Sequence, residues 1–139
     1  MRFVTRCLLL TTLMTAACSG SNTTAPSTSS GTFTQTDLVV GTGAEAVTGK
    51  SATVTYSGWL YDTSKTDGKG TFFDGGSGFT FTLGAGTVIA GWDQGVVGMK
   101  VGGQRRLIIP PDLAYGSQGR SQIPPNATLV FDITLTGVQ

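Results

Sequence analysis

The chain has 139 residues, of which 39% are hydrophobic and 21 are glycine, a composition that suits one small domain rich in strands and turns. It contains no histidine, which excludes His-based catalytic triads, histidine metal ligands and a histidine pH switch. Nine basic and eight acidic residues give a formal charge of +1, and the only cationic cluster is Arg105-Arg106, so a basic nucleic-acid-binding face is excluded as well.

The first segment has the three parts of a secretory signal: Arg2 and Arg6, then an apolar core, then small residues. Its apolar core is too short to span a bilayer as a permanent helix. Removal of Arg2 and Arg6 with this segment leaves seven basic and eight acidic residues, which is a net charge of −1. Cys7 and Cys18 both lie in this part, so the folded part contains no thiol and no disulfide.

Two interpretations of Cys18 compete. Thr15-Ala-Ala-Cys18 resembles a bacterial lipobox, with Thr15 where leucine is more usual, and this would make Cys18 the lipidated first residue. Otherwise Cys18 is incidental, and an ordinary signal peptidase cuts near Ala16-Ala17. The Ser/Thr/Gly/Pro run at Ser19–Gly31 reads as a flexible tether and favours the lipoprotein. We therefore expect a signal peptide at 1–17, a tether at 18–34 and one domain at 35–139, exported to the cell envelope or periplasm and held at the membrane only through lipid on Cys18.

The folded part begins with strands. Asp37–Gly41 is interpreted as a first strand, followed by turns. The stretch Ser51–Tyr61 alternates between polar and apolar side chains and predicts a half-buried strand; its apolar face holds Ala52, Val54, Tyr56, Gly58 and Leu60. Asp62–Gly70 is polar and predicts an exposed loop. Gly75–Gly78 is interpreted as a loop without side-chain bulk, before a second alternating strand at Phe79–Leu83.

A short helix is predicted within Gly86–Met99. Ile89, Trp92 and Val96 fall at i, i+3 and i+7, the spacing of one apolar helix face. Internal glycines at 91 and 95 each cost about 1 kcal/mol relative to alanine, so packing must stabilise this helix.

Two further strands follow, at Gln104–Ile109 and Thr128–Val138, separated by an irregular loop that begins at Pro110 and ends at Pro125. The last strand places Leu129, Phe131, Ile133 and Leu135 on one face. Strands joined by tight turns, with one helix, indicate an antiparallel α+β domain in which a twisted sheet wraps around the helix.

The sequence contains no G-x-S-x-G elbow, no C-x-x-C, no Walker loop and no acid pair at helical spacing. The isolated acids Asp74, Asp93, Asp112 and Asp132 are interpreted as turn and strand-face residues. Aromatic and β-branched side chains instead gather beside the loops, which predicts an apolar ligand pocket; they are Tyr56, Phe73, Phe79, Val88, Ile89, Trp92, Tyr115, Ile123 and Phe131.

Residues 36 to 138 resemble the FKBP family of peptidyl-prolyl cis/trans isomerases. The resemblance rests on motifs in order and spacing: Val54-Thr-Tyr-Ser-Gly58, Phe73-Asp74, Val88-Ile-Ala-Gly-Trp92, Pro111-Asp-Leu-Ala-Tyr-Gly116 and Ile123-Pro-Pro-Asn-Ala-Thr-Leu-Val-Phe131. It implies a five-stranded antiparallel sheet that curls around one short helix, a prolyl isomerase activity without metal or cofactor, and a monomer. Proline-containing polypeptides would be the substrates, and macrolide immunosuppressants such as tacrolimus would be inhibitors.

The resemblance also implies roles for the pocket residues. Trp92 would form the floor under the proline ring, and Tyr56, Asp74, Tyr115 and Phe131 would join it as catalytic residues. The remaining substrate-binding residues would be Phe73, Phe79, Val88, Ile89 and Ile123. Asp74 would polarise the site or hold Tyr56 in place; alternatively, it is a turn-capping residue before Gly75.

The chain departs from the family pattern around the pocket: the Gly75–Gly78 loop is shorter and lacks an arginine often found there, the Asp62–Gly70 loop is longer, and Arg120 stands at a variable loop position. Because these departures flank the pocket, they would change the substrate preference rather than the fold. Besides the isomerase, two other functions are compatible with the sequence: a non-catalytic chaperone or peptide-binding module of the same fold, and a structural envelope lipoprotein, which would explain the tether but not the pocket.

Overall fold

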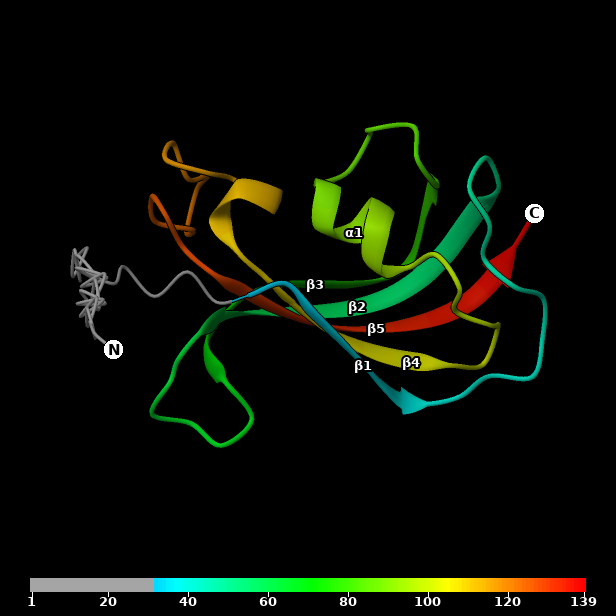
Figure 1. The fold of residues 1–139 in the computed structure, drawn as a ribbon, viewed down its shortest axis with the longest axis horizontal. Coiled ribbons are helices and arrows are strands. Elements are labelled where there is room, and N and C mark those ends of the chain that lie inside the picture. Colours follow the sequence, from blue (N-terminus) through cyan, green and yellow to red (C-terminus); the bar gives the residue numbers. More distant parts are fainter. Residues whose placement is uncertain (1–31) are drawn as a thin grey trace, which may run out of the picture.

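A computed structural model describes residues 32–139, so the predictions made for the signal peptide, Cys18 and most of the tether lie outside the described residues. One five-stranded antiparallel sheet, in the order β1-β4-β5-β2-β3, carries a single short α-helix (Figure 1). The elements are β1 (Thr34–Val39), β2 (Ser51–Tyr61), β3 (Lys69–Thr82), α1 (Ala90–Gly95), β4 (Gln104–Ile109), the 3₁₀ helix η1 (Pro111–Leu113) and β5 (Leu129–Val138). This architecture confirms the predicted α+β class.

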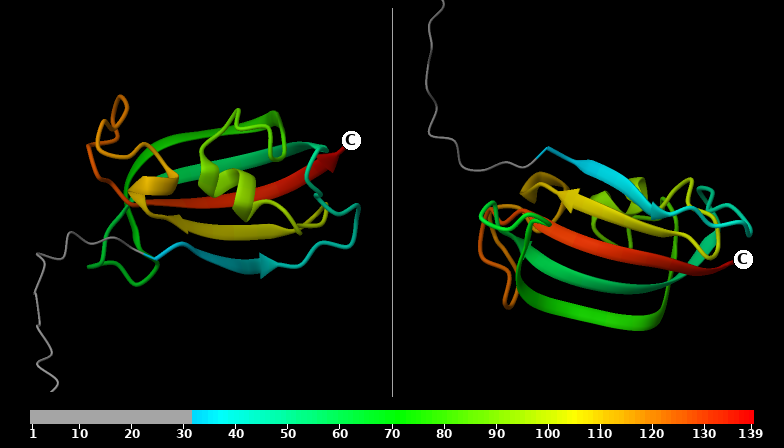
Figure 2. Two further views of the ribbon diagram at one scale, coloured as in Figure 1. Left: turned by 45° about the horizontal axis from the view of Figure 1, so that its top comes forward. Right: turned by 90° about the horizontal axis from the view of Figure 1, so that it is seen from below.

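The sheet curves around α1, which lies across its concave face (Figure 2). The alternating apolar positions of β2, β4 and β5 face the helix and form the core; the fully buried ones include Val54, Leu107, Ile109, Leu129, Ile133 and Leu135. Trp92 and Val96, two of the three residues expected on the apolar helix face, are buried there, whereas Ile89 is half-buried directly before the first residue of α1. Among the described residues, no helix is long and apolar enough to cross a membrane.

Two glycines allow α1 to lie directly on β4. A Cβ atom at Gly91 would come within 2.5 Å of Ile109 Cγ2, and one at Gly95 within 2.6 Å of both δ-carbons of Leu107. Distances this short are far inside van der Waals contact, so a side chain at either position would require the helix or the buried Ile109 and Leu107 side chains to shift. The glycines that weaken the helix by propensity are therefore required by its packing.

Arg105 of β4 connects β1 to the carboxyl end of α1. Its Nε donates to Oδ1 of Asp37 at 2.6 Å, and its Nη1 donates to the carbonyl oxygens of Gly95 and Val97 at 2.9 and 3.1 Å. The hydrogen bond and charge of Arg105 lower the pKa of Asp37 below its usual value. The buried guanidinium thus satisfies carbonyls that the short helix leaves without intrahelical partners.

The structure corrects three predicted boundaries. Gly75–Gly78 is not a loop: it lies inside β3, where Gly75 pairs with Ser57 and Gly76 with Tyr56 of β2. Strand β3 already begins at Lys69, so the predicted 62–70 loop ends two residues earlier. Strand β1 spans Thr34–Val39 rather than Asp37–Gly41, because pairing with β4 defines this edge strand, and its six exposed residues carry no burial pattern.

Asp132 lies on the face of β5 opposite to the core, at the centre of an ion-pair network. Its carboxylate accepts hydrogen bonds from Lys69 Nζ at 2.6 Å and from Arg106 Nε and Nη2 at 2.7 and 3.0 Å. Burial raises the pKa of Asp132, but the hydrogen bonds from Arg106 and Lys69 more than offset this and lower it overall. The network joins β3, β4 and β5 and agrees with a strand-face role for this acid.

Candidate active site

A cavity of about 660 Å³ lies between α1, the concave face of the sheet and the loops beside them. All ten residues that the sequence proposed as catalytic or substrate-binding line it: Tyr56, Phe73, Asp74, Phe79, Val88, Ile89, Trp92, Tyr115, Ile123 and Phe131. The structure thus brings them together from three strands (β2, β3 and β5), the helix and two loops. Their individual roles remain predictions.

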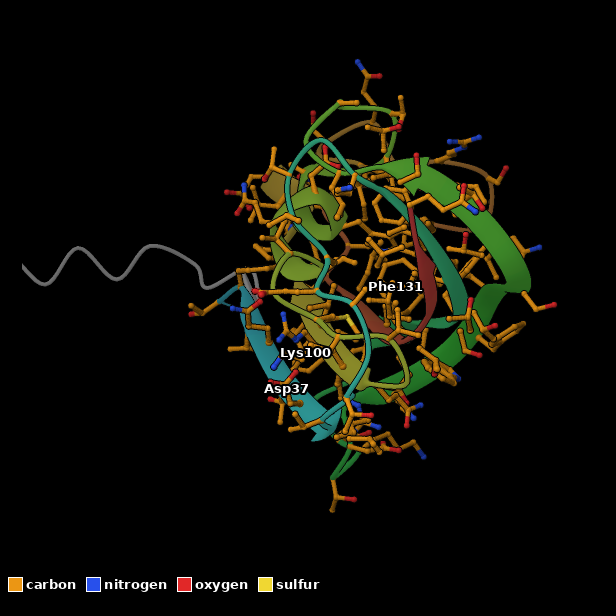
Figure 3. All side chains as sticks on the ribbon, turned by 90° about the vertical axis from the view of Figure 1, so that its right-hand side faces the viewer. Asp37, Lys100 and Phe131 are labelled. Carbon is orange, nitrogen blue, oxygen red and sulfur yellow. The ribbon has the colours of Figure 1, made fainter. Side chains whose placement is uncertain are left out.

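Trp92 forms part of both the cavity lining and the core, and only 5% of it is exposed. Its ring packs edge-on against Tyr56 at 5.0 Å and against Phe131 at 5.2 Å, centroid to centroid. Phe131 projects from β5 into the space between sheet and helix (Figure 3). Within the described part of the chain, the buried indole Nε1 has no hydrogen-bond partner. This edge-to-face aromatic packing gives the cavity a rigid apolar base.

Tyr56 and Asp74 are hydrogen-bonded at the side of the cavity. The Tyr56 hydroxyl donates to Asp74 Oδ2 at 3.0 Å, while Oδ1 of the same carboxylate accepts the Gly75 backbone N–H at 2.9 Å. The contact with Tyr56 expected for Asp74 is therefore present, whereas the turn that Asp74 would cap is not, because Gly75 continues strand β3. Burial raises the pKa of the Tyr56 hydroxyl, and the hydrogen bond and charge of Asp74 raise it further.

Phenylalanine rings form the walls of the cavity towards β3. Phe73 meets Phe131 edge-on at 5.6 Å, and Phe79 meets Tyr56 at 6.0 Å. Because both phenylalanines belong to β3, the pairing of β3 with β2 sets their position. Phe79 is itself 41% exposed, so this wall is open to solvent and accessible to a ligand.

The loop before α1 is fixed by Asp93 in the first turn of the helix. Asp93 Oδ1 accepts the Gly84 N–H and Oδ2 accepts the Gly86 N–H, both at 3.1 Å. This double contact positions the segment that carries Val88 and Ile89 to the cavity. Within residues 32–139 the Ile89 N–H makes no hydrogen bond, although its carbonyl accepts from the helix. The sequence alone had indicated only a turn or strand-face residue at Asp93. The feature that could have indicated its contacts is that Asp93 follows a glycine-rich loop.

The loop between η1 and β5 closes the opposite rim with a tight turn. Arg120 and Ile123 exchange both backbone hydrogen bonds, at 2.9 and 2.7 Å, and Ser121 between them has a positive φ of 47°. The Arg120 guanidinium lies 5.8 Å from the centre of the Tyr115 ring. The cavity lining missed by sequence reasoning is Thr87, Arg120, Ser121 and Gln122. Three of these belong to the turn, and only Arg120 had been singled out, as a departure from the family pattern.

The chemistry available in the cavity is apolar recognition with a few hydrogen-bonding groups. Asp74 and Arg120 are its two charged residues, and Tyr56, Tyr115, Thr87 and Ser121 supply hydroxyls. Within the described range, no three His, Cys, Asp or Glu side chains gather closely enough to hold a metal ion. A compact apolar ring held beside hydrogen-bond donors is the kind of ligand that such a cavity fits.

Comparison with known proteins agrees with this geometry. Residues 43–136 match the family model described as FKBP-type peptidyl-prolyl cis-trans isomerase. An FK506-binding protein of Neisseria meningitidis serogroup A is 48% identical over 103 residues, covering 73% of this chain and 92% of the relative. FK506-binding protein 1B of Neurospora crassa is 45% identical over 105 residues, covering 73% and 93%. The crystal structure of a peptidyl-prolyl cis-trans isomerase from Pseudomonas syringae superimposes with a TM-score of 0.64 at 36% identity, covering 77% of this chain and 75% of that one.

Proposed function

The chain belongs to the family of FKBP-type peptidyl-prolyl cis-trans isomerases, and we propose that its cavity binds the proline of exported polypeptides and catalyses rotation about the preceding peptide bond. The observation that carries this proposal is the meeting of Trp92, Tyr56 and Phe131 at the base of one open cavity. The proline ring would enter the cavity, and the rest of the peptide would lie along its rim.

The reaction needs moderate acceleration and no bond cleavage. Rotation about an X-Pro bond has to break amide resonance, with a barrier near ~20 kcal/mol, and takes roughly 10 to 100 s without a catalyst. A turnover of about 10 to 1,000 per second therefore requires that the barrier fall by about 3 to 7 kcal/mol. A binding site can supply this without a nucleophile or a metal.

The aromatic cavity would lower the barrier by binding the transition state of the rotation more tightly than the ground state. A planar amide carries more charge separation than the twisted amide of the transition state, and water solvates the planar form better. Transfer of the bond from water to the aromatic surface of Trp92, Tyr56 and Phe131 would therefore stabilise the twisted form relative to the ground state. The catalysis is then a property of the surface as a whole rather than of one acid or base.

Two donors on the rim would orient the peptide. The Ile89 N–H has no acceptor within the described residues, and the Tyr115 hydroxyl lies on the opposite loop, so each is suited to a substrate carbonyl. A hydrogen bond of this kind is worth ~0.5 to 1.5 kcal/mol. Tyr115→Phe should accordingly cost at most about tenfold in kcat/KM.

The test is an isomerisation assay on a proline tetrapeptide between pH 6 and pH 9. We expect kcat/KM to be nearly flat, because carboxylates stay ionised and tyrosines neutral across that range, and Tyr56 has a raised pKa. A bell-shaped profile would contradict a mechanism without acid–base catalysis. A folded protein that binds the peptide but never accelerates exchange would instead be a peptide-binding module.

Macrolide binding follows from the same proposal, because relatives at 48% and 45% identity are named FK506-binding proteins. We propose that the macrolide occupies the apolar cavity and competes with the peptide. Inhibition by FK506 that is relieved by excess peptide would support this competition, whereas inhibition independent of peptide concentration would contradict it.

A further inference from the structure

We propose that Arg120 makes this enzyme prefer substrates with an acidic side chain directly before or after the proline. The inference rests on the proposed function, because it identifies the substrate class of the same cavity. It begins from an asymmetry of charge: the two charged residues of the lining, Asp74 and Arg120, differ in how far other groups of the chain satisfy them.

Asp74 already has partners for both of its oxygens. The Tyr56 hydroxyl donates to Oδ2, and the Gly75 N–H donates to Oδ1. A substrate cation would have to share these oxygens with donors that stay in place. Asp74 is therefore a poor partner for a basic peptide.

Arg120 is exposed and makes no ion pair within residues 32–139, where the ion pairs join Lys69, Arg105 and Arg106 to Asp37 or Asp132. Its neighbour is an uncharged ring, that of Tyr115, at 5.8 Å. The flat guanidinium can stay against this ring and still offer its edge donors to a carboxylate, which it binds through two parallel N–H groups. The only cation of the cavity lining is thus available to an acidic ligand.

The backbone under Arg120 is fixed rather than free. Arg120 and Ile123 are joined by two backbone hydrogen bonds, and Ser121 holds a left-handed conformation that residues other than glycine rarely adopt. A Cβ at Gly119 would lie 2.5 Å from the Ile123 carbonyl oxygen, so the turn is closed tightly on both sides. Because Ile123 and Tyr115 also line the cavity, the fixed backbone places the base of the Arg120 side chain at the rim, from where its guanidinium would reach residues next to a bound proline.

The test compares acetylated, amidated tetrapeptides that differ at one residue, Glu, Gln or Lys, placed before or after proline. Exchange between cis and trans is measured by NMR with the whole protein, so no coupling protease imposes its own preference. In about 20 mM salt we expect kcat/KM for the Glu peptide to exceed that for the Gln peptide roughly two- to fivefold in at least one placement, as for an exposed ion pair. The ratio should approach one in 0.5 M salt, where charges are screened within about 3 to 5 Å.

Two variants of Arg120 test whether this residue causes the preference for the Glu peptide. Arg120→Gln should bring the Glu-to-Gln ratio of kcat/KM to about one, and Arg120→Glu should shift the preference to the Lys peptide. Lys100→Gln is the matched control: this exposed lysine lies near Asp37 (Figure 3), outside the cavity lining, and its loss should leave the Glu-to-Gln ratio intact.

Equal values for Glu and Gln in both placements, or a preference that survives Arg120→Gln, would overturn the inference. Peptide binding, followed in parallel by NMR titration, separates this failure from failure of the isomerase. If no peptide is turned over and the Glu peptide still binds more tightly through Arg120, the acidic preference holds and the isomerase proposal fails. If the Gln peptide is turned over and no charge preference exists, only the acidic preference fails.

Discussion

Tyr56 and Asp74, 18 residues apart on neighbouring strands, are joined by a hydrogen bond of 3.0 Å from the phenolic hydroxyl to Oδ2. The bond holds the Tyr56 ring where it meets the Trp92 ring at 5.0 Å. A polar contact at the rim thereby fixes an aromatic surface inside the cavity.

The first prediction concerns this bond. Tyr56→Phe removes one hydrogen bond and leaves the ring, so kcat/KM should fall by the equivalent of about 0.5 to 1.5 kcal/mol. Asp74→Val should cost more, because the Gly75 N–H and the Tyr56 hydroxyl both lose their acceptor. Steady-state kinetics on one proline tetrapeptide measures both variants. Equal or smaller losses for Asp74→Val would limit the role of Asp74 to its hydrogen bond with Tyr56.

The two tryptophans provide a matched pair for the second prediction. Trp92→Leu should weaken macrolide and peptide binding, because aromatic area is lost from the cavity, and should lower stability by about 1 to 3 kcal/mol. Trp59→Leu should leave binding unchanged, since Trp59 lies outside the cavity and packs on Phe72 and under Lys69. Calorimetric titration with FK506 and urea unfolding measure the two effects. Parental affinity in Trp92→Leu would show that Trp92 serves only the core.

Third, the glycines of α1 should resist replacement by a better helix former. Gly91→Ala and Gly95→Ala should each destabilise the domain by about 1 to 3 kcal/mol through overpacking against Ile109 and Leu107, although alanine gains about 1 kcal/mol in helix propensity. Gln94→Ala, at an exposed position of the same helix, should be neutral or stabilising. The midpoints of urea unfolding rank the three variants. A gain of stability from either glycine substitution would contradict the close approach.

The fourth prediction is a pH dependence of stability. The pKa of Asp132 is lowered in the folded state, so its contribution is present above the unfolded value of about 3.9 and is lost as pH falls through the lower folded value. Asp132→Asn should cost about 1.5 to 3 kcal/mol at pH 7, since Arg106 and Lys69 lose an ionised acceptor. Below about pH 4 the difference between the variant and the parent should begin to shrink, and it should vanish only once pH is below the lowered folded pKa. Urea unfolding at pH 7, 5 and 3 tests this, and a constant difference across the series would argue against it.

Fifth, Cys18, outside the described residues, should carry lipid. The parent protein should partition into the membrane fraction, and Cys18→Ser should release it or leave it unprocessed. Because a single acyl chain anchors only marginally, mass spectrometry should find two or more chains on the mature N-terminus. A soluble parent with an unmodified N-terminus after cleavage near Ala16-Ala17 would eliminate the anchor.

The sequence determined the elements whose pattern is local. Alternation identified β2 with its observed bounds and β5 to within one residue, and the spacing of Ile89, Trp92 and Val96 located the helix. The aromatic and β-branched residues beside the loops gave nine of the fourteen residues that line the cavity, because large apolar side chains next to polar loops have few other places to go. The alternation of burial in β2 and β5 shows why: a half-buried strand imposes its period on the residues themselves.

What only the tertiary structure decided depends on partners distant in the chain. Arg105 and Asp37 are separated by 68 residues, and nothing local to either predicts their ion pair. Gly75–Gly78 looks like a loop by composition, yet it lies inside β3, where Gly75 and Gly76 pair with β2 and Gly78 takes a left-handed φ of 70° at a register shift. The roles of Asp93 and Arg120 likewise follow from where a carboxylate meets a loop and where a turn places a charge beside the cavity. Such contacts form only when distant parts of the chain come together on folding. Their energy depends on which two residues meet, and no periodic pattern in the sequence encodes that.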